Sequence, residues 1–219
     1  MKTALIIGST GLVGEQCLKV LLASNYYSKV IALTRRRLDS KNVKLENLVV
    51  DFDKLVTYRE QIKADDIYCA IGTTIGKAGS QAAFRKVDFE IPLQVAEIAK
   101  QNGAEKFILV SSLSANAKSM VFYSRTKGQL EEALAKLNYG SLIIFRPSLL
   151  LGDRKEKRTG EQVAEFLMKK LPFLVSGPFA KYKGTPADLL AATMVKLGTS
   201  NVKGVRAIDN DEIFVLAEK

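Results

Sequence analysis

The feature that constrains this chain most is a set of three glycines that follows its first apolar segment. The glycines are Gly8, Gly11 and Gly14. The segment Ala4–Ile7 before them has the composition of a buried strand, and Glu15–Leu22 after them has the apolar spacing of a helix. In such a strand–turn–helix unit, glycines allow a sharp turn and a close approach to a pyrophosphate, which the free amides of the helix N-terminus stabilise. The spacing Gly-x-x-Gly-x-x-Gly therefore predicts nucleotide binding, with a structural tight turn as the alternative.

Strand and helix patterns alternate along the rest of the chain. Strands are predicted over 29–34, 48–50, 66–72, 106–110 and 141–145, and helices over 53–61, 80–101, 120–134, 161–170 and 186–197. This alternation is typical of an α/β protein with a doubly wound parallel sheet of the Rossmann type. With 219 residues the chain suits one domain, 1–219, in which residues 146–219 contribute a small C-terminal cap on the substrate side. We expect the tail, 205–216, to dock as short strands.

The composition excludes several classes of function. Because the chain has no His, it lacks His-based triads and typical zinc sites, so we predict no metal ion and acid–base chemistry from Tyr, Lys, Asp, Glu or Ser. Lys and Arg outnumber Asp and Glu by 33 to 23, but they are scattered and no nucleic-acid motif accompanies them, so no nucleic-acid partner is predicted. No apolar run approaches the roughly 18 residues of a membrane span. With Cys17 and Cys69 predicted as buried thiols, we expect a cytoplasmic protein without membrane contact.

Two arginines follow the second predicted strand, at the edge where doubly wound sheets bind their ligands. A cofactor with a free ribose 2′-hydroxyl usually meets an acidic residue at this point, whereas this chain has Arg35 and Arg36. Guanidinium groups bind phosphate and keep their charge, so the pair favours NADP(H), with its 2′-phosphate, over NAD. A solvated basic turn is the alternative.

Two further strand ends carry candidate cofactor-binding residues. Asp51 and Phe52 follow the third strand and fit either a contact with adenine or the start of a helix, which an acidic residue caps. Gly72 and Thr73 follow the fourth strand and begin a glycine-rich loop. Glycine permits close backbone contact, so this loop fits closure over the nicotinamide, or a merely flexible connection.

The candidate catalytic pair is Tyr123 and Lys127, on the helix predicted over 120–134. Four residues apart, they lie on one face of the helix, about one turn from each other. A nearby ammonium favours the ionised phenol, so Lys127 prepares Tyr123 to exchange a proton with a carbonyl or alcohol and can also hold a ribose hydroxyl. Ser111 and Ser112 end the fifth strand, and either is predicted to position the substrate oxygen. A surface Tyr-x-x-x-Lys that occurs by chance is the alternative.

Together these motifs resemble the atypical or extended short-chain dehydrogenase/reductase superfamily. That resemblance rests on the glycine spacing, on Ser followed by Tyr-x-x-x-Lys, and on Lys86-Val87-Asp88 before a long helix. More narrowly, the chain is similar to the Tat-interactive-protein oxidoreductase-like branch and its bacterial relatives. The segments that carry this similarity are Gly72-Thr73-Thr74 with Gly76-Lys77-Ala78-Gly79, the arginine pair, Asp51-Phe52, Phe145-Arg146-Pro147, and Leu149 to Arg154 with Arg158.

The resemblance implies a set of contacts with NADPH and a role for Tyr123 as proton donor or acceptor. The contact residues that it implies are Thr10, Gly11, Leu12, Val13, Arg35, Arg36, Ile71, Gly72, Tyr123, Lys127, Leu150 and Arg158. We therefore predict an NADPH-dependent oxidoreductase that reduces a small-molecule carbonyl, as a monomer or homodimer. One alternative is a non-catalytic NADP(H)-binding redox sensor with a protein partner, and another is an epimerase or dehydratase with tightly held NAD.

Overall fold

The computed structural model describes residues 2–152 and 182–218, and its centre is a sheet of seven strands. The strands are β1 (Lys2–Ile7), β2 (Tyr27–Thr34), β3 (Leu45–Val49), β4 (Asp66–Cys69), β5 (Lys106–Val110), β6 (Ser141–Arg146) and β9 (Gly204–Asp209). Their order across the sheet is β3-β2-β1-β4-β5-β6-β9, and every neighbouring pair is parallel. The predicted doubly wound α/β fold of the Rossmann type is thus confirmed.

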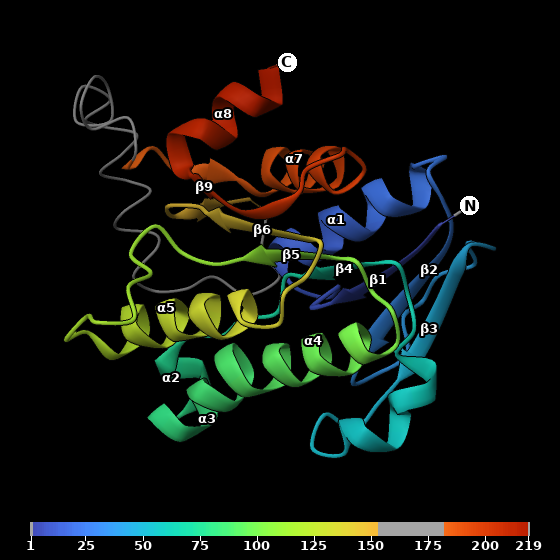
Figure 1. Cartoon of the computed structure of the whole chain (residues 1–219), viewed down its shortest axis with the longest axis horizontal. Coiled ribbons are helices and arrows are strands. Elements are labelled where there is room, and N and C mark those ends of the chain that lie inside the picture. Colours follow the sequence, from blue (N-terminus) through green and yellow to red (C-terminus); the bar gives the residue numbers. More distant parts are fainter. Residues whose placement is uncertain (1, 153–181, 219) are drawn as a thin grey trace.

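Helices cover both faces of this sheet (Figure 1). One face carries α1 (Leu12–Ala23), α7 (Ala187–Gly198) and α8 (Asn210–Glu218), and the other carries α2 (Ile75–Ala78), α3 (Gln81–Arg85), α4 (Ile91–Gln101) and α5 (Phe122–Ala135). Successive residues of a strand point to opposite faces. In β1, Leu5 and Ile7 therefore join the core that includes residues of α4 and α5, whereas Ala4 and Ile6 join the core that includes residues of α1 and α7. Burial on both faces explains why the central strands are almost continuously apolar.

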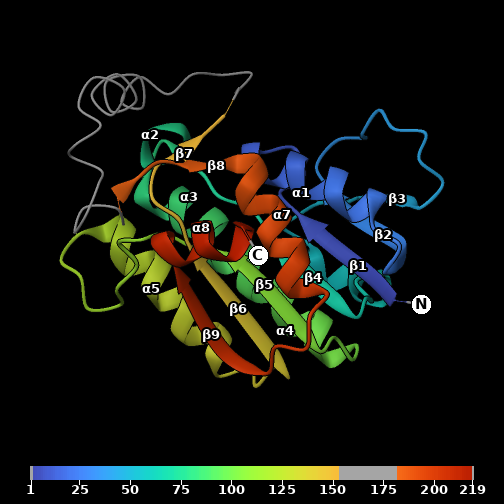
Figure 2. The same cartoon turned by 90° about the horizontal axis from the view of Figure 1, so that it is seen from above.

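The chain reverses its direction of winding at β1, the third of the seven strands across the sheet. Ile7, the last residue of β1, lies opposite Leu33 of β2 on one side and Cys69 of β4 on the other, so the three strands end level with one another. The connections that follow β1 and β4 leave toward opposite faces and open a crevice at the carboxyl ends. Figure 2 shows α2, α3 and the short pair β7 (Leu150–Leu151) and β8 (Thr185–Pro186) beyond these ends. This edge is where the candidate residues gather.

Two predicted helices differ in detail. The helix predicted over 53–61 is a 3-10 helix, η1 (Leu55–Gln61). The helix predicted over 80–101 is divided into α3, a π-helical turn, η2 (Lys86–Glu90), and α4. Pro92 lies in the first turn of α4, directly after η2, where the N–H of Ile91 donates to the carbonyl of Lys86. Proline offers no N–H to an α-helical ladder, and the wider π turn precedes it.

The C-terminal tail, 205–216, differs more from its predicted structure. Instead of short strands over 205–216, it forms one edge strand, β9, and then α8. Asp211 and Glu212 in the first turn of α8 favour a helix start because carboxylates stabilise the positive end of a helix dipole. The helix predicted over 161–170 and the basic residues from Arg154 to Arg158 lie outside the described residues.

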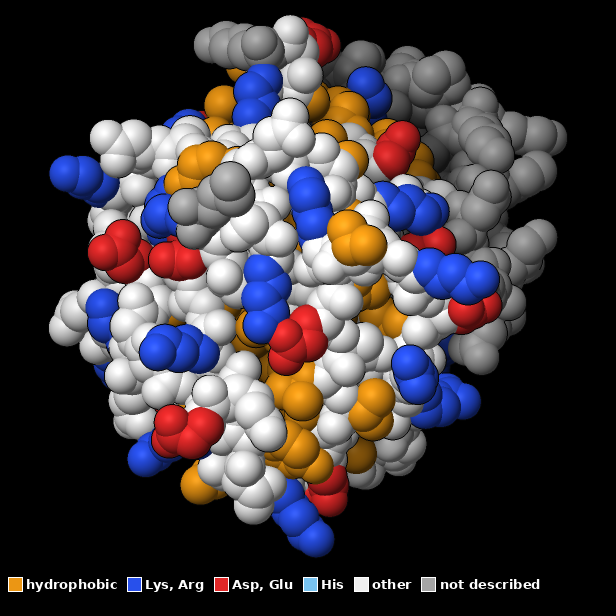
Figure 3. Space-filling view, turned by 90° about the vertical axis from the view of Figure 1, so that its right-hand side faces the viewer, with side chains coloured by type: hydrophobic (Ala, Val, Ile, Leu, Met, Phe, Trp, Pro, Cys, Tyr) orange, Lys and Arg blue, Asp and Glu red, His pale blue; other side chains and the backbone are white. Residues whose placement is uncertain are grey.

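The described surface bears on the prediction that no nucleic acid binds. Figure 3 shows the side of the molecule that lies on the right in Figure 1, and there Lys and Arg are spaced among Asp and Glu instead of forming one basic stripe. Within residues 2–152 and 182–218, no helix combines the length and apolarity needed to cross a bilayer.

Candidate functional site

The glycine turn is closed so tightly that a side chain does not fit at two of its positions. Gly8 has a φ of +85°, and a Cβ there would lie 2.5 Å from the carbonyl carbon of Ala70, at the end of β4. A Cβ on Gly14 would lie 2.0 Å from the carbonyl oxygen of Gly8. The N–H of Gly11 donates to that same oxygen over 2.9 Å and closes the turn. Glycine at 8 and 14 therefore lets α1 start directly against β1 and β4.

The same turn fits the pyrophosphate of a dinucleotide. α1 begins at Leu12, so the first-turn N–H groups have no acceptor within the helix and point toward the carboxyl edge of the sheet. Thr10 and Gly11 are exposed there, whereas the side chain of Val13 lies in the core and leaves only its backbone for a ligand. The hydroxyl of Ser9 is buried and has no hydrogen-bond partner among the described residues. Sequence reasoning missed Ser9 because it lies between the glycines that define the pattern.

The arginine turn after β2 is held by one residue of β3. Arg35 and Arg36 are exposed, as a 2′-phosphate contact requires. Asn47 accepts a hydrogen bond from the N–H of Leu38 over 2.7 Å and donates to the hydroxyl of Thr34 over 2.7 Å, so it joins the two ends of the turn. Asn47 was not among the predicted site residues; a polar residue inside the third strand was the available signal.

Asp51 lies in a turn before η1 and does not cap that helix, whose N-cap is Lys54 without a side-chain hydrogen bond. The Asp51 carboxylate accepts a hydrogen bond from the N–H of Asp53 over 3.0 Å just before η1, in the manner of an Asx turn. Phe52 is half-buried and packs against the core beneath α4. Contacts of Asp51 and Phe52 with adenine stay predictions.

The predicted catalytic pair lies on the first two turns of α5. The ring of Tyr123 is half-buried, and its centroid lies 5.6 Å from that of the buried Phe84 of α3. The side chain of Lys127 is 6% exposed, and its Nζ lies 2.7 Å from Oδ1 of Asp88 in η2. Burial lowers the pKa of Lys127, but the charges of Asp88 and Tyr123 more than offset this, so the pKa is raised overall. Lys127 is therefore a cation at neutral pH although it is buried.

Asp88 is the main site residue that sequence reasoning missed. Besides its ion pair with Lys127, it accepts the N–H of Thr73 through Oδ2 over 2.8 Å. A Cβ on Gly72 would lie 3.3 Å from Asp88 Oδ1 and 3.7 Å from Lys127 Nζ, so the strand end, η2 and α5 meet at this point. The signal was an acidic residue inside an apolar helix pattern, which predicts a buried charge only if a partner is known.

The two predicted serines have different surroundings. Ser111 is buried and donates to Oε1 of Glu131 over 2.5 Å, and Glu131 in turn binds Arg146 over 2.6 Å. Ser112 is half-buried, and its hydroxyl lies 3.2 Å from that of Ser114. Because the Ser111 hydroxyl is engaged in a buried network, Ser112 fits the predicted substrate contact better.

A glycine within α5 brings the loop after Ser112 close to the catalytic pair. A Cβ on Gly128 would lie 2.1 Å from the backbone nitrogen of Ala117, and the N–H of Asn116 donates to the carbonyl of Ser124 over 3.0 Å. Glycine in a helix interior costs about 1 kcal/mol relative to alanine, so its use here has a packing reason.

The predicted Leu150 contact lies on a small wall formed by β7 and β8. Next to it, a Cβ on Gly152 would lie 3.0 Å from Cδ1 of Leu12, so this wall touches the start of α1. Asn210, buried at the start of α8, accepts hydrogen bonds from the N–H of Ser148 over 3.0 Å and from the hydroxyl of Thr185. Its amide also donates to the carbonyl of Lys183 over 2.7 Å. Arg158, the other residue predicted in this region, lies outside the described residues.

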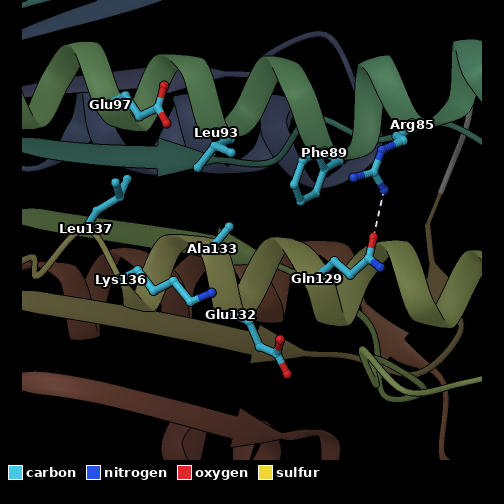
Figure 4. A pocket seen from close by; sticks show the side chains of 9 residues that line it. All are labelled: Arg85, Phe89, Leu93, Glu97, Gln129, Glu132, Ala133, Lys136 and Leu137. Carbon is cyan, nitrogen blue, oxygen red and sulfur yellow. Dashed lines mark hydrogen bonds between the residues drawn. The ribbon is translucent and has the colours of Figure 1, made fainter.

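A separate groove of about 430 Å³ lies between α4 and α5 (Figure 4). Its floor is apolar, with Phe89 and Leu93 facing Ala133 and Leu137, and Arg85 at one end donates to Gln129 over 2.7 Å. No predicted site residue lines this groove, so we place the candidate site at the carboxyl ends of the strands.

Comparison with known proteins agrees with this arrangement. A family model described as "NAD dependent epimerase/dehydratase family" matches residues 4–188. The chain is 38% identical to Protein HTATIP2 of Rattus norvegicus over 175 residues, which cover 78% of this chain and 72% of that protein. It is 40% identical to "Protein FMP52, mitochondrial" of Candida albicans over 166 residues, which cover 73% and 72% of the two chains.

Among solved structures, MoeE5 in complex with UDP-glucuronic acid and NAD has the same fold, with a TM-score of 0.71 at 15% identity. The match covers 94% of this chain and 75% of that one. The family match over most of the sequence and the two relatives above 30% identity agree with the glycine turn and the Tyr123–Lys127 pair. The chain therefore belongs to the NAD dependent epimerase/dehydratase family of extended short-chain dehydrogenases/reductases, in the branch of HTATIP2 and FMP52.

Proposed function

We propose that this protein is an NADPH-dependent oxidoreductase that reduces a small-molecule carbonyl group. The observation that carries the proposal is the position of Lys127 Nζ: it lies beside the backbone at Gly72, at the end of β4, on the same helix face as Tyr123. β4 is the neighbour of β1, and the glycine turn follows β1 directly. A proton donor and a cation therefore stand next to the turn that fits a dinucleotide.

The family's cofactor is a nicotinamide dinucleotide, and we propose NADPH in this chain. MoeE5 was solved with NAD, and the family name also refers to NAD. Support for NADPH comes from the turn after β2, where Thr34 is followed by the exposed Arg35 and Arg36. Two guanidinium groups suit a 2′-phosphate, whereas an acidic residue there would repel it.

The proposed chemistry divides between cofactor and chain. When bound in its reduced form, the nicotinamide supplies a hydride to the carbonyl carbon. Tyr123 donates its hydroxyl proton to the carbonyl oxygen, and the adjacent charge of Lys127 stabilises the phenolate that remains. Ser112 holds the carbonyl oxygen by a hydrogen bond, since Ser111 already donates to Glu131.

The proposal is tested by turnover with a panel of aldehydes, ketones and quinones, followed as oxidation of NADPH. We expect Tyr123→Phe to lower kcat by roughly 10²–10⁴-fold with little change in NADPH affinity, because the variant loses only a proton-transfer group. Tyr26→Phe is a matched control, since Tyr26 is 37% exposed and lies before β2, at the amino end of the sheet. Turnover that survives Tyr123→Phe would contradict the assignment of the proton donor.

A second candidate function is that of an NADP(H)-binding sensor that regulates a protein partner without turnover. Ser111 already donates to Glu131, so its position after β5 is explained without a substrate contact, which suits a sensor. NADPH binding without turnover of any carbonyl in the panel would support the sensor. An epimerase or dehydratase with tightly held NAD is the third candidate, and co-purified NAD would support it.

We also propose a cytoplasmic monomer or homodimer without nucleic-acid or membrane partners. Cys17 and Cys69 are both buried free thiols, which suits a reducing compartment. The name of the FMP52 relative contains the word mitochondrial, so fractionation of cells that express this chain decides between the two compartments.

A further inference from the structure

We infer that Asp88 is a positioning residue, which holds Lys127 inside the protein as a cation and joins it to the end of β4. The ion pair over 2.7 Å and the hydrogen bond from the Thr73 N–H over 2.8 Å use the two different oxygens of one carboxylate. The side chains of Lys127 and Asp88 are 6% and 1% exposed, so water does not substitute for either partner. The inference rests on the proposed function only for the catalytic use of Lys127, not for the pairing itself.

Asp88 is the partner that balances the charge of Lys127 among the described groups around it. The groups that face Lys127 are Asp88 from η2, Tyr123 from the preceding turn of α5, and Cys69 from β4. Burial raises the pKa of the Cys69 thiol to about 12, so this group is neutral near pH 7. Glu131, one turn further along α5, binds Arg146 over 2.6 Å. Asp88 thus supplies the formal negative charge that a buried ammonium requires.

This arrangement sets the sign of a pH dependence. In the wild-type protein, the raised pKa of Lys127 contributes stability that is present below the unfolded pKa and is lost as pH rises through the folded pKa. In Asp88→Asn, burial, the largest influence on the pKa of Lys127, acts without the carboxylate that opposes it most, so we expect the folded pKa to fall below the unfolded value of about 10.4. The unfolded chain then binds more protons than the folded one, and stability rises with pH between the two values. Below the unfolded pKa, Lys127 therefore adds no slope in the wild type and adds a positive slope in the variant.

The experiment is urea unfolding from about pH 7 to about pH 10, a range that lies below the unfolded pKa of lysine. The variants are Asp88→Asn, the double variant Asp88→Asn with Lys127→Met, and Glu131→Gln. We expect the free energy of unfolding of Asp88→Asn to rise with pH relative to the wild type. The slope should correspond to a difference of up to one bound proton between the unfolded and folded states. The double variant should lose this rise. Glu131→Gln is the matched control: it also removes a buried carboxylate from an ion pair, but Arg146 keeps its charge throughout this range.

Each outcome decides the inference. Equal slopes for the wild type and Asp88→Asn would overturn it. If Asp88→Asn is unfolded near pH 7, refolding toward pH 10 or on addition of Lys127→Met supports the inference, and failure to refold by either route contradicts it. The measurement needs neither cofactor nor substrate, so it stands apart from the turnover test. Stability that rises with pH only in Asp88→Asn, in a protein that reduces no carbonyl, would support the role of Asp88 and reject the proposed function.

Discussion

At the scale of single residues, the site depends on its glycines, which have no side chain, as much as on its charged and polar side chains. Gly8 and Gly14 allow three backbone segments to meet, because a Cβ at either position would overlap carbonyl atoms. Backbone atoms do not move aside as the end of a flexible side chain does. The glycine turn therefore fixes the first turn of α1 against the end of β4, which is the position a pyrophosphate requires.

We predict that Gly14→Ala disrupts this turn. Its Cβ would lie 2.0 Å from the Gly8 oxygen, so α1 must shift, at a cost of about 1–3 kcal/mol in stability and a loss of NADPH affinity of roughly tenfold or more. Urea unfolding and fluorescence titration with NADPH measure the two effects. Gly76→Ala is the control, because a Cβ there has no atom within 4 Å. Equal behaviour of the two variants would show that the close contact is relieved without cost.

Site residues were predictable from the sequence where their arrangement depends only on spacing within one segment. The glycines at 8, 11 and 14 and the pair Tyr123–Lys127 are such patterns, since a turn or a helix fixes their geometry locally. Asp88 was not predictable, because its partner lies 39 positions further along the chain and only the packing of η2 against α5 brings them together (127 − 88 = 39). The network of Ser111 with Glu131 escaped prediction for the same reason.

At the scale of elements, the central strands and their parallel arrangement were predictable, whereas helix type and the C-terminal tail were not. Parallel strands buried on both faces are continuous apolar runs, which single sequences display clearly. The π-helical turn of η2 depends on how Pro92 and the neighbouring α5 are accommodated, and α8 forms where an apolar tail suggested strands. Such choices depend on tertiary packing that no local pattern contains.

Three elements are joined at Asn210, and we predict that Asn210→Ala loosens the wall next to Leu150. The half-buried N–H of Ser148 and the buried hydroxyl of Thr185 both lose their acceptor, which costs about 1–3 kcal/mol. Because the wall touches Leu12, NADPH affinity falls as well. Amide hydrogen exchange at Ser148 and Thr185, with urea unfolding, measures the change.

The control for that prediction is Asn42→Ala. Asn42 is exposed, and its side chain accepts one local hydrogen bond, from the N–H of Lys44. We expect this variant to differ from the wild type by no more than about 0.5 kcal/mol. Unchanged exchange at Ser148 in Asn210→Ala would mean that other contacts hold the wall.

At the scale of the whole molecule, the excess of positive charge favours anionic ligands in general, and the arginine turn makes this selective. A formal net charge of +10 attracts any polyanion at long range, and salt screens that attraction. In the function proposed above, Arg35 and Arg36 add a short-range contact that only a 2′-phosphorylated cofactor uses. The two contributions differ in their dependence on salt and on the cofactor.

We therefore predict that NADPH affinity falls more steeply with salt than NADH affinity, by roughly tenfold between about 50 mM and about 500 mM salt. In Arg35→Ala with Arg36→Ala, the two cofactors should bind with similar affinity and similar salt dependence. Arg37→Ala controls for the loss of positive charge from the same exposed turn. Fluorescence titration with both cofactors gives the dissociation constants, and tight NADH binding equal to that of NADPH in the wild type would reject the NADPH proposal.

The hydrogen bonds of Asn210 also imply an order in which the parts of the site form during protein synthesis. A ribosome synthesises the glycine turn early. It synthesises Asn210 much later, after all seven strands of the central sheet. A nascent chain can form β1, α1 and β2 while the wall near Leu150 still lacks the residue that holds it. The wall beside the glycine turn is therefore complete only after β9 and α8 have left the exit tunnel, so a ligand that needs this wall binds the assembled domain.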